Sequence, residues 1–588
     1  MIDASAPFVL LDDARRAGAA PARLYRAPER IVVARGQDEV GAALEALRAA
    51  AAHGLHAAGF IAYEAGHALE PKLAAPSAPA LPLIWFGLFA DYERIASDAV
   101  EALLPDPAGG WAGAPEPSVG QADHAAALAT VQAYIAAGDI YQANLTFQAA
   151  VRTAGHPLAI YAGLRARARA GYGGVIWTGT DWLLSLSPEL FFALRDGRLT
   201  TKPMKGTATR GRTAAEDALA IETLRSDPKQ RAENLMIVDL LRNDLSRVAA
   251  PGSVAVPALF AVETYPTVHQ MTSTVTAELA PGKGAVDIVS AIFPCGSITG
   301  APKIRAMEVI GEVEPGPRGA YTGAIGRLDP GGDAAFNVAI RTLHLPAGAT
   351  TATMGLGSGI VADSRADEEW RECLAKGAFV ESVSRFDLFE TMAFDPAEGV
   401  LRLERHLARM KASAQALGFV FDRHQARNEL QAATFKLRVP AKIRLMLGRR
   451  GTLAIEIRPM PATVEGPVAI ALALLPVASG DFRLVHKTTD RSFYAQALAA
   501  SGAFDVAFVD PQGFLTEGSF TSLFVQQGGM LLTPPLSRGL LPGVLRAELI
   551  DEGHAREADL RPEDLAQGFL VGNALRGLIP AQLVTGPR

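Results

Sequence analysis

The sequence predicts an α+β protein of more than one domain, with largely antiparallel sheets in its N-terminal part. The chain has 588 residues, which is too long for one hydrophobic core and suggests roughly two to four domains. Its composition, 49% hydrophobic and 20% charged residues, is typical of globular proteins. From Gln121 onward, stretches with helical periodicity are mixed with β-branched stretches of alternating polarity. That order favours antiparallel sheets over a repeated strand–helix–strand unit.

These patterns place the elements along the chain. The Pro/Gly-rich stretch 103–118 has no periodicity and is expected to be a loop that follows an N-terminal α+β segment. Apolar residues at helical spacing then predict helices over roughly 122–138, 214–226, 229–247 and 366–383. Runs rich in β-branched and apolar residues predict strands over 175–179, 183–187, 321–328, 335–345 and 351–361.

Charge, cysteine count and hydropathy exclude several classes of protein. The net charge is −6 without blocks of one sign, so nothing indicates a nucleic-acid partner. The two cysteines, Cys295 and Cys373, cannot form a disulfide framework or a thiolate zinc site, which fits a reducing compartment. The N-terminus carries acids where a signal peptide needs bases, and no apolar run reaches the roughly eighteen residues of a membrane helix. We therefore expect a cytoplasmic protein with no membrane segment.

A candidate metal site lies in the helix predicted over 366–383. Glu369, Glu372 and Lys376 are three and four residues apart, so they share one face of that helix. Two carboxylates aimed together repel each other unless a cation lies between them, and they suit Mg²⁺ that is shared with an anionic substrate. A lysine one turn further on could hold a substrate carboxylate. Spacing alone favours the other interpretation, a solvated helix face with an ordinary ion pair.

Other candidate residues carry little information by themselves. Glu233 lies in an amphipathic helix and Glu189 follows the strand predicted over 183–187, and each alone is expected to be structural. The glycines of GLGSGI, around Gly357, do not open a helix in a strand–helix–strand unit, so they are a poor dinucleotide-binding signal. They are better explained by backbone N–H groups that approach a ligand closely.

Eight motifs follow one another in a fixed order along the first part of the chain. They are GDIYQANLTF (138–147), SLSPELFF (185–192), KPMKGT (202–207), RAENLMIVDLLRNDL (231–245), FPCGSITGAPKIRAM (293–307), YTGAIG (321–326), AIRT (339–342) and GSGIVADSRADEEWRECLAK (357–376). Together they resemble the chorismate-utilising enzymes, the family of anthranilate, aminodeoxychorismate, isochorismate and salicylate synthases. The resemblance runs from about residue 120 to 380, and less clearly from the N-terminus, and it implies a fold of two antiparallel sheets with outer helices.

The roles of the family's residues carry over onto matching positions. By this resemblance Glu189 protonates the departing C4 hydroxyl of chorismate, which requires a neutral acid with a raised pKa. For His269, a lone histidine, a purely structural role is as good an interpretation as a place in the substrate site. The resemblance further implies that Glu233, Glu369 and Glu372 hold Mg²⁺ against a chorismate carboxylate, that Tyr321, Arg341, Lys376 and the backbone around Gly357 bind substrate carboxylates, and that His269 and Ser297 line the substrate site.

Lys205 distinguishes between members of this family. Anthranilate synthases carry a small residue in the corresponding P-I-A-G-T motif, whereas aminodeoxychorismate synthases resemble this chain in having P-x-K-G-T. In those synthases the lysine is thought to attack C2 of chorismate, after which ammonia adds at C4. A buried lysine near Mg²⁺ can lose its proton near neutral pH, as that role requires. The resemblance therefore implies 4-amino-4-deoxychorismate as the product.

A second domain begins where the sequence starts afresh near Ser384. We place the boundary at about residue 384, between a first domain over 1–384 and a second over 385–588. The second domain resembles the class IV aminotransferases and aminodeoxychorismate lyases, which bind pyridoxal 5′-phosphate (PLP) in a smaller α/β fold. The motifs are FETM (389–392), ERHLARM (404–410), HKTTDRSFY (486–494), LTEGSFTSLF (515–524), SRGLLPGVLR (537–546) and VGNALRGLIPA (571–581).

The residues for PLP also follow from this resemblance. PLP needs a lysine that binds it covalently, an acid at its ring nitrogen and an anion site for its phosphate. By resemblance these are Lys487, Glu517, and Arg409 with the backbone at Gly543 and Val544. Lys487 would also abstract the proton whose loss leads to elimination of pyruvate, which leaves an aromatic ring.

Two departures from the family pattern leave alternatives open. The domain begins almost at FETM, without the family's N-terminal hairpin, and Ser522 stands where many members have Asn. The chain could thus be a synthase alone, with a second domain that is inactive or serves for dimerisation. Lys205 argues against an anthranilate synthase. Fusion to an aminodeoxychorismate-type synthase weakens the interpretation of the second domain as a transaminase. The retained Glu189, Glu233 and Glu369 argue against a chain that only serves as a scaffold for an amidotransferase.

The leading expectation is a bifunctional enzyme that makes 4-aminobenzoate and pyruvate from chorismate and ammonia. The ammonia should come from a separate glutamine amidotransferase subunit. Family glutaminases place their cysteine in G-x-C-x-G and their histidine in H-x-E, whereas Cys295 and Cys373 lie in FPCGS and RECLA, and no histidine here has Glu two positions later. A homodimer through the PLP domain is a further expectation.

Overall fold

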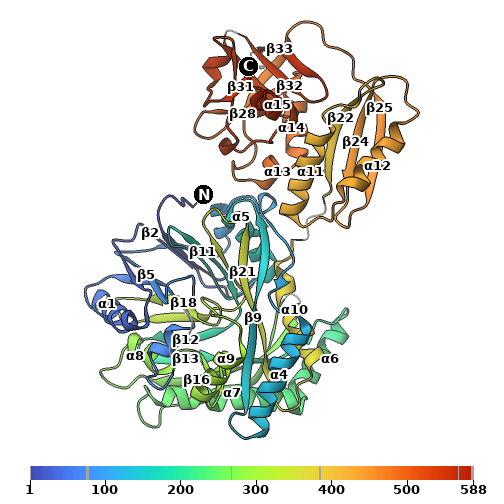
Figure 1. Cartoon of the computed structure of the whole chain (residues 1–588). Coiled ribbons are helices and arrows are strands. Elements are labelled where there is room, and N and C mark those ends of the chain that lie inside the picture. The colour runs from blue at the N-terminus through green and yellow to red at the C-terminus, as the bar shows by residue number, and fades with distance from the viewer. Residues whose placement is uncertain (1, 74–78, 266–267, 383–385, 567, 585–588) are drawn as a thin grey trace. The chain divides into compact units, whose positions relative to one another are not determined.

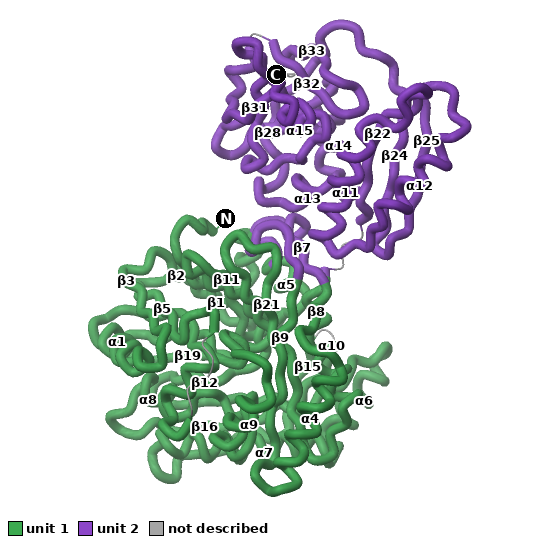
Figure 2. Tube along the Cα trace, viewed as in Figure 1, with its two compact units in different colours: residues 1–104, 114–151, 161–381 green, residues 105–113, 152–160, 382–588 purple. Residues whose placement is uncertain are grey.

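The computed structural model describes residues 2–73, 79–265, 268–382, 386–566 and 568–584. The chain divides into two compact units (Figure 2), and each is considered by itself. The first unit comprises residues 1–104, 114–151 and 161–381, and the second comprises 105–113, 152–160 and 382–588. Two short segments from the N-terminal half of the chain thus belong to the second unit. The boundary expected near residue 384 lies outside the described residues.

The first unit contains two large antiparallel sheets with helices outside them (Figure 1), which confirms the predicted α+β fold class. The first sheet has the strand order β17 (Gly300–Ala301), β9 (Gln142–Ala154), β21 (Thr351–Ile360), β20 (Thr342–Pro346), β11 (Asp181–Ser187), β10 (Tyr172–Trp177), β1 (Phe8–Asp12), β2 (Ala22–Arg26) and β6 (Glu93–Ile95), with β8 (Glu116–Pro117) beside β9. The short strand β7 (Trp111–Ala112) pairs with the last residues of β9, and both of these segments belong to the second unit. The second has the order β14 (Met204–Thr209), β16 (Val268–Glu278), β13 (Arg198–Lys202), β12 (Leu190–Arg195), β19 (Ala334–Val338), β18 (Ala324–Leu328), β4 (His56–Ile61), β5 (Ile84–Phe89) and β3 (Arg30–Ala34), with β15 (Ala255–Thr264) beside β16.

The four helices predicted from periodicity are present, and one of them ends earlier than predicted. The helix expected over 366–383 stops at Gly377 and continues as a short 3-10 turn over Ala378–Val380. The two helices that follow Lys205 in the chain, over 214–226 and 228–246, are capped by Thr213 and Asp227. The side chains of these two residues accept hydrogen bonds from backbone N–H groups of the first helical turn. The helices are α1 (Val40–Ala52), α2 (Ala65–Ala68), α3 (Val100–Leu103), α4 (Gln121–Ala136), α5 (Pro157–Ala168), α6 (Ala214–Ser226), α7 (Pro228–Ser246), α8 (Ala285–Ile292), α9 (Lys303–Val313) and α10 (Ala366–Gly377).

One core cluster of the first unit joins its two sheets. Val9 and Ile176 enter it from β1 and β10 of the first sheet, whereas Phe60 and Ile325 enter it from β4 and β18 of the second. All four side chains are at most 2% exposed. Because burial of such side chains stabilises a fold in proportion to the apolar area removed from water, this cluster holds the sheets face to face.

The strand predicted over 335–345 is wrong as a single element. It is two strands, β19 in the second sheet and β20 in the first, separated by a corner at which Arg341 has a φ of 51°. The chain makes the same change of sheet between β11 and β12, at Glu189. The two crossovers are hydrogen-bonded to each other, since Val338 N donates to Glu189 O over 3.1 Å and Leu186 N donates to Arg341 O over 3.0 Å. Glu189 and Arg341 are thereby placed where the chain passes between the sheets.

The second unit is a smaller α/β body with two sheets. The first has the order β23 (Gly399–Val400), β22 (Leu388–Asp395), β24 (Ala441–Leu447) and β25 (Leu453–Pro459). The second, of mixed direction, has the order β28 (Leu515–Gly518), β27 (Asp505–Val509), β26 (Val468–Leu474), β33 (Gly577–Leu583), β32 (Phe569–Asn573), β29 (Ser522–Gln527), β30 (Met530–Thr533) and β31 (Ala555–Glu557). Its helices are α11 (Leu403–Leu417), α12 (Arg423–Thr434), α13 (Phe482–Val485), α14 (Ser492–Ser501) and α15 (Val544–Asp551).

Among the residues that the structure describes, no helix is both long and apolar enough to cross a bilayer.

A buried ion pair anchors β1 to α5. Arg165 donates to Asp12 from Nε over 2.6 Å and from NH2 over 3.2 Å, and the hydroxyl of Tyr161 donates to the same carboxylate over 2.9 Å. The side chains of Asp12 and Arg165 are 0% and 6% exposed. Removal of one partner would leave the other charge buried without compensation.

We therefore expect Arg165→Met to lower the free energy of unfolding of the first unit by about 3–5 kcal/mol. Calorimetric unfolding of the variant against the parent chain measures this. Arg242→Met is the matched control, because Arg242 pairs with Asp239 at the surface with 53% and 58% of the side chains exposed, where an ion pair contributes ~1 kcal/mol or less. Equal effects of the two substitutions would contradict the prediction.

Candidate active sites

Glu189 is a buried carboxylic acid that faces a hydroxyl group. Its side chain accepts a hydrogen bond from Ser297 Oγ over 2.7 Å, and the residue is 6% exposed. Ser297 Oγ in turn lies 3.2 Å from Cys295 Sγ. Burial raises the pKa of Glu189 to about 7, although the Ser297 hydrogen bond and the charges of Lys205 and Lys376 act in the opposite direction. Near neutral pH, Glu189 is therefore a proton donor as well as a base.

Lys205 lies on β14, between α7 and the β21 strand. Asn234 of α7 donates from Nδ2 to the backbone oxygen of Lys205 over 3.4 Å. On the other side, a Cβ added at Gly359 would come within 2.9 Å of Lys205 Nζ, so the amine lies close against the backbone of β21. Burial lowers the pKa of Lys205, and Lys376 adds to this, while Glu233, Glu372 and Glu189 oppose it. The structure thus brings Lys205 and Glu189 into one electrostatic cluster.

Lys376 connects this cluster to α10. Its Nζ donates to Gly357 O over 3.0 Å and lies 2.7 Å from Glu372 Oε1. The predicted substrate-binding positions Gly357 and Lys376 are therefore adjacent. Burial tends to raise the pKa of Glu372, but Lys376, Lys205 and Lys229 outweigh it, so that the pKa of this carboxyl is lowered.

The three predicted metal ligands are neighbours but do not form a ready metal site. Among the described residues, no group of three or more His, Cys, Asp or Glu side chains is close enough to hold a metal ion. Glu372 is paired with Lys376, and Glu369 accepts from Ser364 Oγ over 2.7 Å. Burial, and then the charge of Glu372, raise the pKa of Glu233. Such carboxylates are mutually repulsive without a cation, and their hard oxygen atoms suit Mg²⁺.

Three other predicted residues have different surroundings. The ring of Tyr321 lies over Gly355, where an added Cβ would come within 2.0 Å of Tyr321 Cδ1. The guanidinium of Arg341 lies 5.7 Å from the centre of the Phe379 ring, and burial lowers the pKa of Arg341. His269 is fully buried, with Nε2 2.8 Å from Asp217 and Nδ1 3.0 Å from Thr264 Oγ1. Both ring nitrogens of His269 are thus engaged by the protein, and its substrate role stays a prediction.

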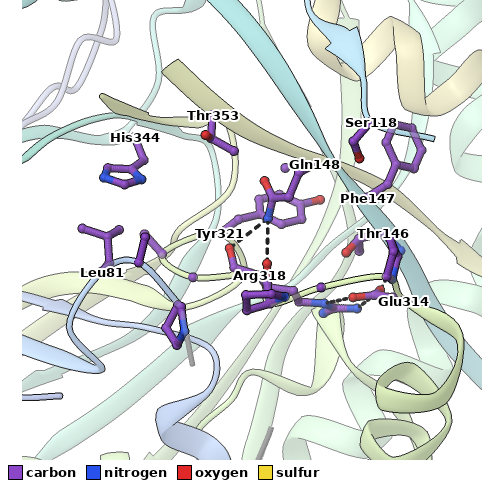
Figure 3. Close-up of a pocket in the computed structure, with 18 of the residues that line it drawn as sticks. Leu81, Ser118, Thr146, Phe147, Gln148, Glu314, Arg318, Tyr321, His344 and Thr353 are labelled. Carbon is purple, nitrogen blue, oxygen red and sulfur yellow. Dashed lines mark hydrogen bonds and ion pairs between the residues drawn. The ribbon is translucent and has the colours of Figure 1, made fainter. Parts of the chain in front are cut away.

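A cavity of about 450 Å³ lies beside Tyr321 (Figure 3). Arg318 crosses its floor, donating to Glu314 from NH2 over 2.6 Å and from Nε over 2.8 Å. Gln148 of β9 donates to the backbone oxygen of Arg318 over 3.1 Å. Sequence reasoning did not predict this cavity, because its walls come from segments far apart in the chain and share no motif.

Gln142, at the start of β9, is a site residue that sequence reasoning missed. It is 1% exposed, and its Nε2 is buried without a hydrogen-bond partner. Like Lys205, it lies against Gly359, where an added Cβ would be 3.0 Å from Gln142 Nε2. The sequence signalled it only by its place within the GDIYQANLTF motif, because a glutamine on a strand indicates no particular chemistry by itself.

The second unit holds a cavity of about 490 Å³ around Lys487. Burial, and then Arg409, lower the pKa of Lys487 to about 7, although Glu390 opposes them. Lys487 Nζ lies 5.2 Å from the centre of the Phe389 ring. The lysine is therefore available as an uncharged amine near neutral pH.

The lining of this cavity includes an acid and the residues expected to bind an anion. Glu517 is 5% exposed, and its Oε1 accepts from the Tyr494 hydroxyl over 2.5 Å and lies 3.6 Å from Arg491 NH2. Burial raises the pKa of Glu517, against the charge of Arg491. Arg409 pairs with Glu390 through Nε and NH2, and its NH1 donates to the backbone oxygen of Pro542, directly before Gly543 and Val544 at the start of α15.

Two details of the cavity bear on whether its residues fit PLP. His406 pairs through Nδ1 with Glu390 over 2.7 Å, yet its Nε2, also buried, has no partner, and the residue lines the cavity. At Gly543 an added Cβ would come within 2.7 Å of Ser522 Oγ, so that glycine keeps the backbone accessible. The lysine, the acid and the anion site expected from sequence thus all line one cavity.

Two protein families match consecutive parts of the chain. Residues 7–382 match the family described as chorismate binding enzyme, and residues 387–584 match class IV amino-transferases. Aminodeoxychorismate synthase component 1 of Klebsiella aerogenes is 45% identical over 246 residues, which cover 42% of this chain and 54% of that protein. The corresponding protein of Bacillus subtilis is 41% identical over 250 residues, 42% of this chain and 53% of the relative. The chain thus spans about half the length of the curated relatives it matches.

A solved structure supports the same assignment. Anthranilate synthase component I from Streptococcus pneumoniae superposes with a TM-score of 0.54 and 26% sequence identity, covering 62% of this chain and 93% of that one. The family match spans more than half of the chain and contains Glu189, Lys205 and the α10 carboxylates. The chain belongs to the chorismate binding enzyme family, here fused to a class IV aminotransferase domain.

Proposed function

We propose that the chain converts chorismate and ammonia into 4-amino-4-deoxychorismate, and that its second unit converts this intermediate into 4-aminobenzoate and pyruvate. The observation that carries the proposal is the pairing of an acid and an amine in the first unit. Glu189, with a pKa raised to about 7, and Lys205, with a lowered pKa, interact with each other in one cluster. The two curated relatives named above are aminodeoxychorismate synthases, and Lys205 in the P-x-K-G-T motif supports this activity over that of an anthranilate synthase.

The first step divides between these two residues. The amine of Lys205 attacks C2 of chorismate while the C4–O bond breaks, and Glu189 gives its proton to the leaving hydroxyl, which departs as water. Ammonia then forms a bond to C4 as the bond between C2 and Lys205 Nζ breaks. The new ammonium group returns one proton to Glu189, so both residues end the cycle as they began it.

Cations and carboxylates around this pair suit the anionic substrate. Arg341 and Lys376, with the backbone of Gly357, would bind the carboxylates of chorismate. Glu233, Glu369 and Glu372 would hold Mg²⁺, which when bound supplies a positive charge that neutralises a substrate carboxylate. Lys376 would then exchange its ion pair with Glu372 for one with the substrate.

In the second unit, the proposed chemistry is a proton transfer followed by elimination. Lys487 would hold PLP covalently, Glu517 would contact its ring nitrogen, and Arg409 with the backbone of Gly543 and Val544 would bind its phosphate. PLP, when bound, supplies the electron sink that makes the C–H bond beside the substrate amine acidic. The amine of Lys487 would take that proton from C4, the C3–O bond would break, and the enolpyruvate that leaves would take up a proton to become pyruvate, while the ring becomes aromatic.

We also propose that ammonia reaches the first unit from a separate glutamine amidotransferase. The relatives of the first unit are named as component 1 of their synthase, which supports a second component. Cys295 and Cys373 are both buried, and burial raises the pKa of their thiols to about 12 and about 11, which suits neither to act as a nucleophile. Ammonium salt alone, but not glutamine alone, should therefore support product formation by the isolated chain.

A homodimer through the second unit is also part of the proposal.

Lys205→Ala should abolish formation of 4-amino-4-deoxychorismate while the chain stays folded. Removal of the nucleophile leaves the substrate bound but unreacted, so we expect turnover below about one thousandth of the parent rate. Mass identification of the products from chorismate, Mg²⁺ and saturating ammonium salt measures it. Lys229→Ala, an exposed lysine of α7 that pairs with Asp363 over 2.9 Å, is the control. Near-normal turnover by Lys205→Ala would remove the nucleophile from the mechanism.

The first step should slow as the pH rises through about 7. Glu189 acts in its protonated form, and its pKa is raised to about 7, so the active fraction falls above that pH. The rate of chorismate consumption with saturating ammonia, measured across pH in the parent chain and in Glu189→Gln, tests this. The variant should be about 10²–10⁴-fold slower and should lose this alkaline decline. An unchanged decline in Glu189→Gln would assign it to another group.

Lys487→Ala should stop the pathway at 4-amino-4-deoxychorismate, without release of pyruvate. In the parent chain, borohydride reduction should fix PLP to Lys487, as peptide mapping would show. Lys442→Ala removes another lysine that lines the same cavity and should leave the label on Lys487. A chain that binds no PLP, or carries the label elsewhere, would favour the alternative of a synthase with an inactive or dimerising second unit.

A further inference from the structure

His406 of α11 has one ring nitrogen that no other group among the described residues engages. The residue is 1% exposed, and its Nδ1 lies 2.7 Å from Glu390 Oε2, whereas its Nε2 is buried without a hydrogen-bond partner. In the first unit, by contrast, both ring nitrogens of His269 are bonded to side chains. A buried polar atom without a partner destabilises a folded chain, so a histidine that served only the fold would be expected to satisfy both nitrogens. The unpartnered Nε2 therefore indicates a ligand.

His406 borders the cavity around Lys487 and is a neighbour of Arg409. The two residues are one helical turn apart on α11, so they share one face of that helix. They also share a partner, because Arg409 NH2 donates over 2.6 Å to the same Oε2 atom of Glu390 that His406 Nδ1 meets. A ligand that reaches Arg409 from the cavity therefore comes close to His406.

Arg409 by itself is poorly equipped to bind a phosphate group. Its Nε and NH2 donate to Glu390 and its NH1 donates to Pro542 O, so each of its nitrogen atoms already makes a hydrogen bond. The Glu390 carboxylate also balances its charge. Burial would raise the pKa of Glu390, but the charge of Arg409 and the hydrogen bond of His406 outweigh it, and the pKa is lowered. A phosphate monoester carries about −1.5 to −2 charges near neutral pH, most of which would stay uncompensated in this site.

The protonation of His406 follows from its contact with Glu390. A carboxylate accepts hydrogen bonds, so Nδ1 carries the hydrogen atom and a neutral ring presents a lone pair at Nε2. Burial lowers the pKa of His406, although Glu390 opposes it, and the charges of Arg409 and Lys487 act with burial. The ring is therefore neutral near pH 7 while the cavity is empty. A phosphate oxygen also presents lone pairs, so the two atoms can bind each other only through an added proton.

We propose that Nε2 of His406 binds the phosphate group of PLP, and that one proton from solvent enters the site with this group and lies between them. The inference rests on the proposed PLP chemistry of the second unit. With that proton in place, Arg409 and His406 together oppose the charges of Glu390 and the phosphate. The contact between Nδ1 and Glu390 then becomes an ion pair, which holds the ring in the orientation that the phosphate needs.

The proton can be counted in the parent chain by comparison of PLP with pyridoxal, which has the same ring and aldehyde but no phosphate. Titration calorimetry in two buffers of different ionisation enthalpy gives the number of protons taken up. At about pH 8 the free phosphate is a dianion, since its second pKa is ~6. Proton changes at Lys487 are common to both ligands and cancel. We expect PLP to take up about one proton more than pyridoxal. Equal proton counts for the two ligands would overturn the proposal.

His406→Asn tests whether this proton belongs to His406. The amide nitrogen of asparagine lies near the place of Nδ1 and can still donate to Glu390, but Nε2 is gone. We expect the Kd for PLP to rise about ten- to a hundredfold, as for loss of a hydrogen bond to a charged group, and the Kd for pyridoxal to change less than about twofold. The extra proton should disappear. His424→Asn, at an exposed histidine of α12, is the matched control and should change neither constant.

The outcomes separate the possible roles of His406. Equal weakening of PLP and pyridoxal in His406→Asn would mean that His406 only supports the fold. If that variant gives no unfolding transition on heating, His406→Gln, whose amide reaches towards the place of Nε2, should bind PLP without the extra proton. A variant with the affinity and proton count of the parent chain would overturn the role of His406 alone. A parent chain that binds neither PLP nor pyridoxal would instead overturn the proposed function of the second unit, and this inference with it.

Discussion

The paired crossovers between the two sheets are the constraint on which the first active site depends. Between β11 and β12, and again between β19 and β20, the chain leaves one sheet and enters the other. The hydroxyl of Ser187 donates to Val338 O over 2.6 Å, and two backbone hydrogen bonds join the same segments. Ordinary strands would direct Glu189 and Arg341 into a sheet face. The crossovers instead hold them at the boundary of the sheets, where a buried acid can meet Ser297 and the Lys205 cluster.

The two units obtain a reactive lysine by the same physical means. In each, burial disfavours the charged ammonium, and a second cation adds to the effect, Lys376 for Lys205 and Arg409 for Lys487. Carboxylates nearby act in the opposite direction, so neither amine is shifted by burial alone. The two lysines differ in which neighbouring polar atom lacks a hydrogen-bond partner. Lys205 shares its space with an amide that has no partner, whereas Lys487 faces a cavity bordered by an unpartnered imidazole nitrogen.

The sequence predicted the fold class and four of the helices, because periodicity is a local property. It could not predict that residues 335–345 divide between two sheets. The apolar alternation continues through Arg341, and only a positive φ at that residue redirects the chain. The α10 stripe was visible as a spacing, but the partners of its carboxylates were not, since Glu372 pairs with Lys376 and Glu369 accepts a hydrogen bond from Ser364. Gln142 and the bond between His269 and Asp217 depend on partners far apart in the chain, which no local pattern records.

The directions of the two pKa shifts make neutral pH the common operating range of the proposed pathway. Glu189 works as an acid, so its active form declines as the pH rises through about 7. Lys487 works as a base, and its pKa is lowered to about 7, so its active form declines as the pH falls through the same value. The first step is therefore limited on the alkaline side by Glu189, and the second on the acid side by Lys487. A chain that carries both steps thus has the acid of the first and the base of the second in their active forms together only near the pH at which these two groups titrate.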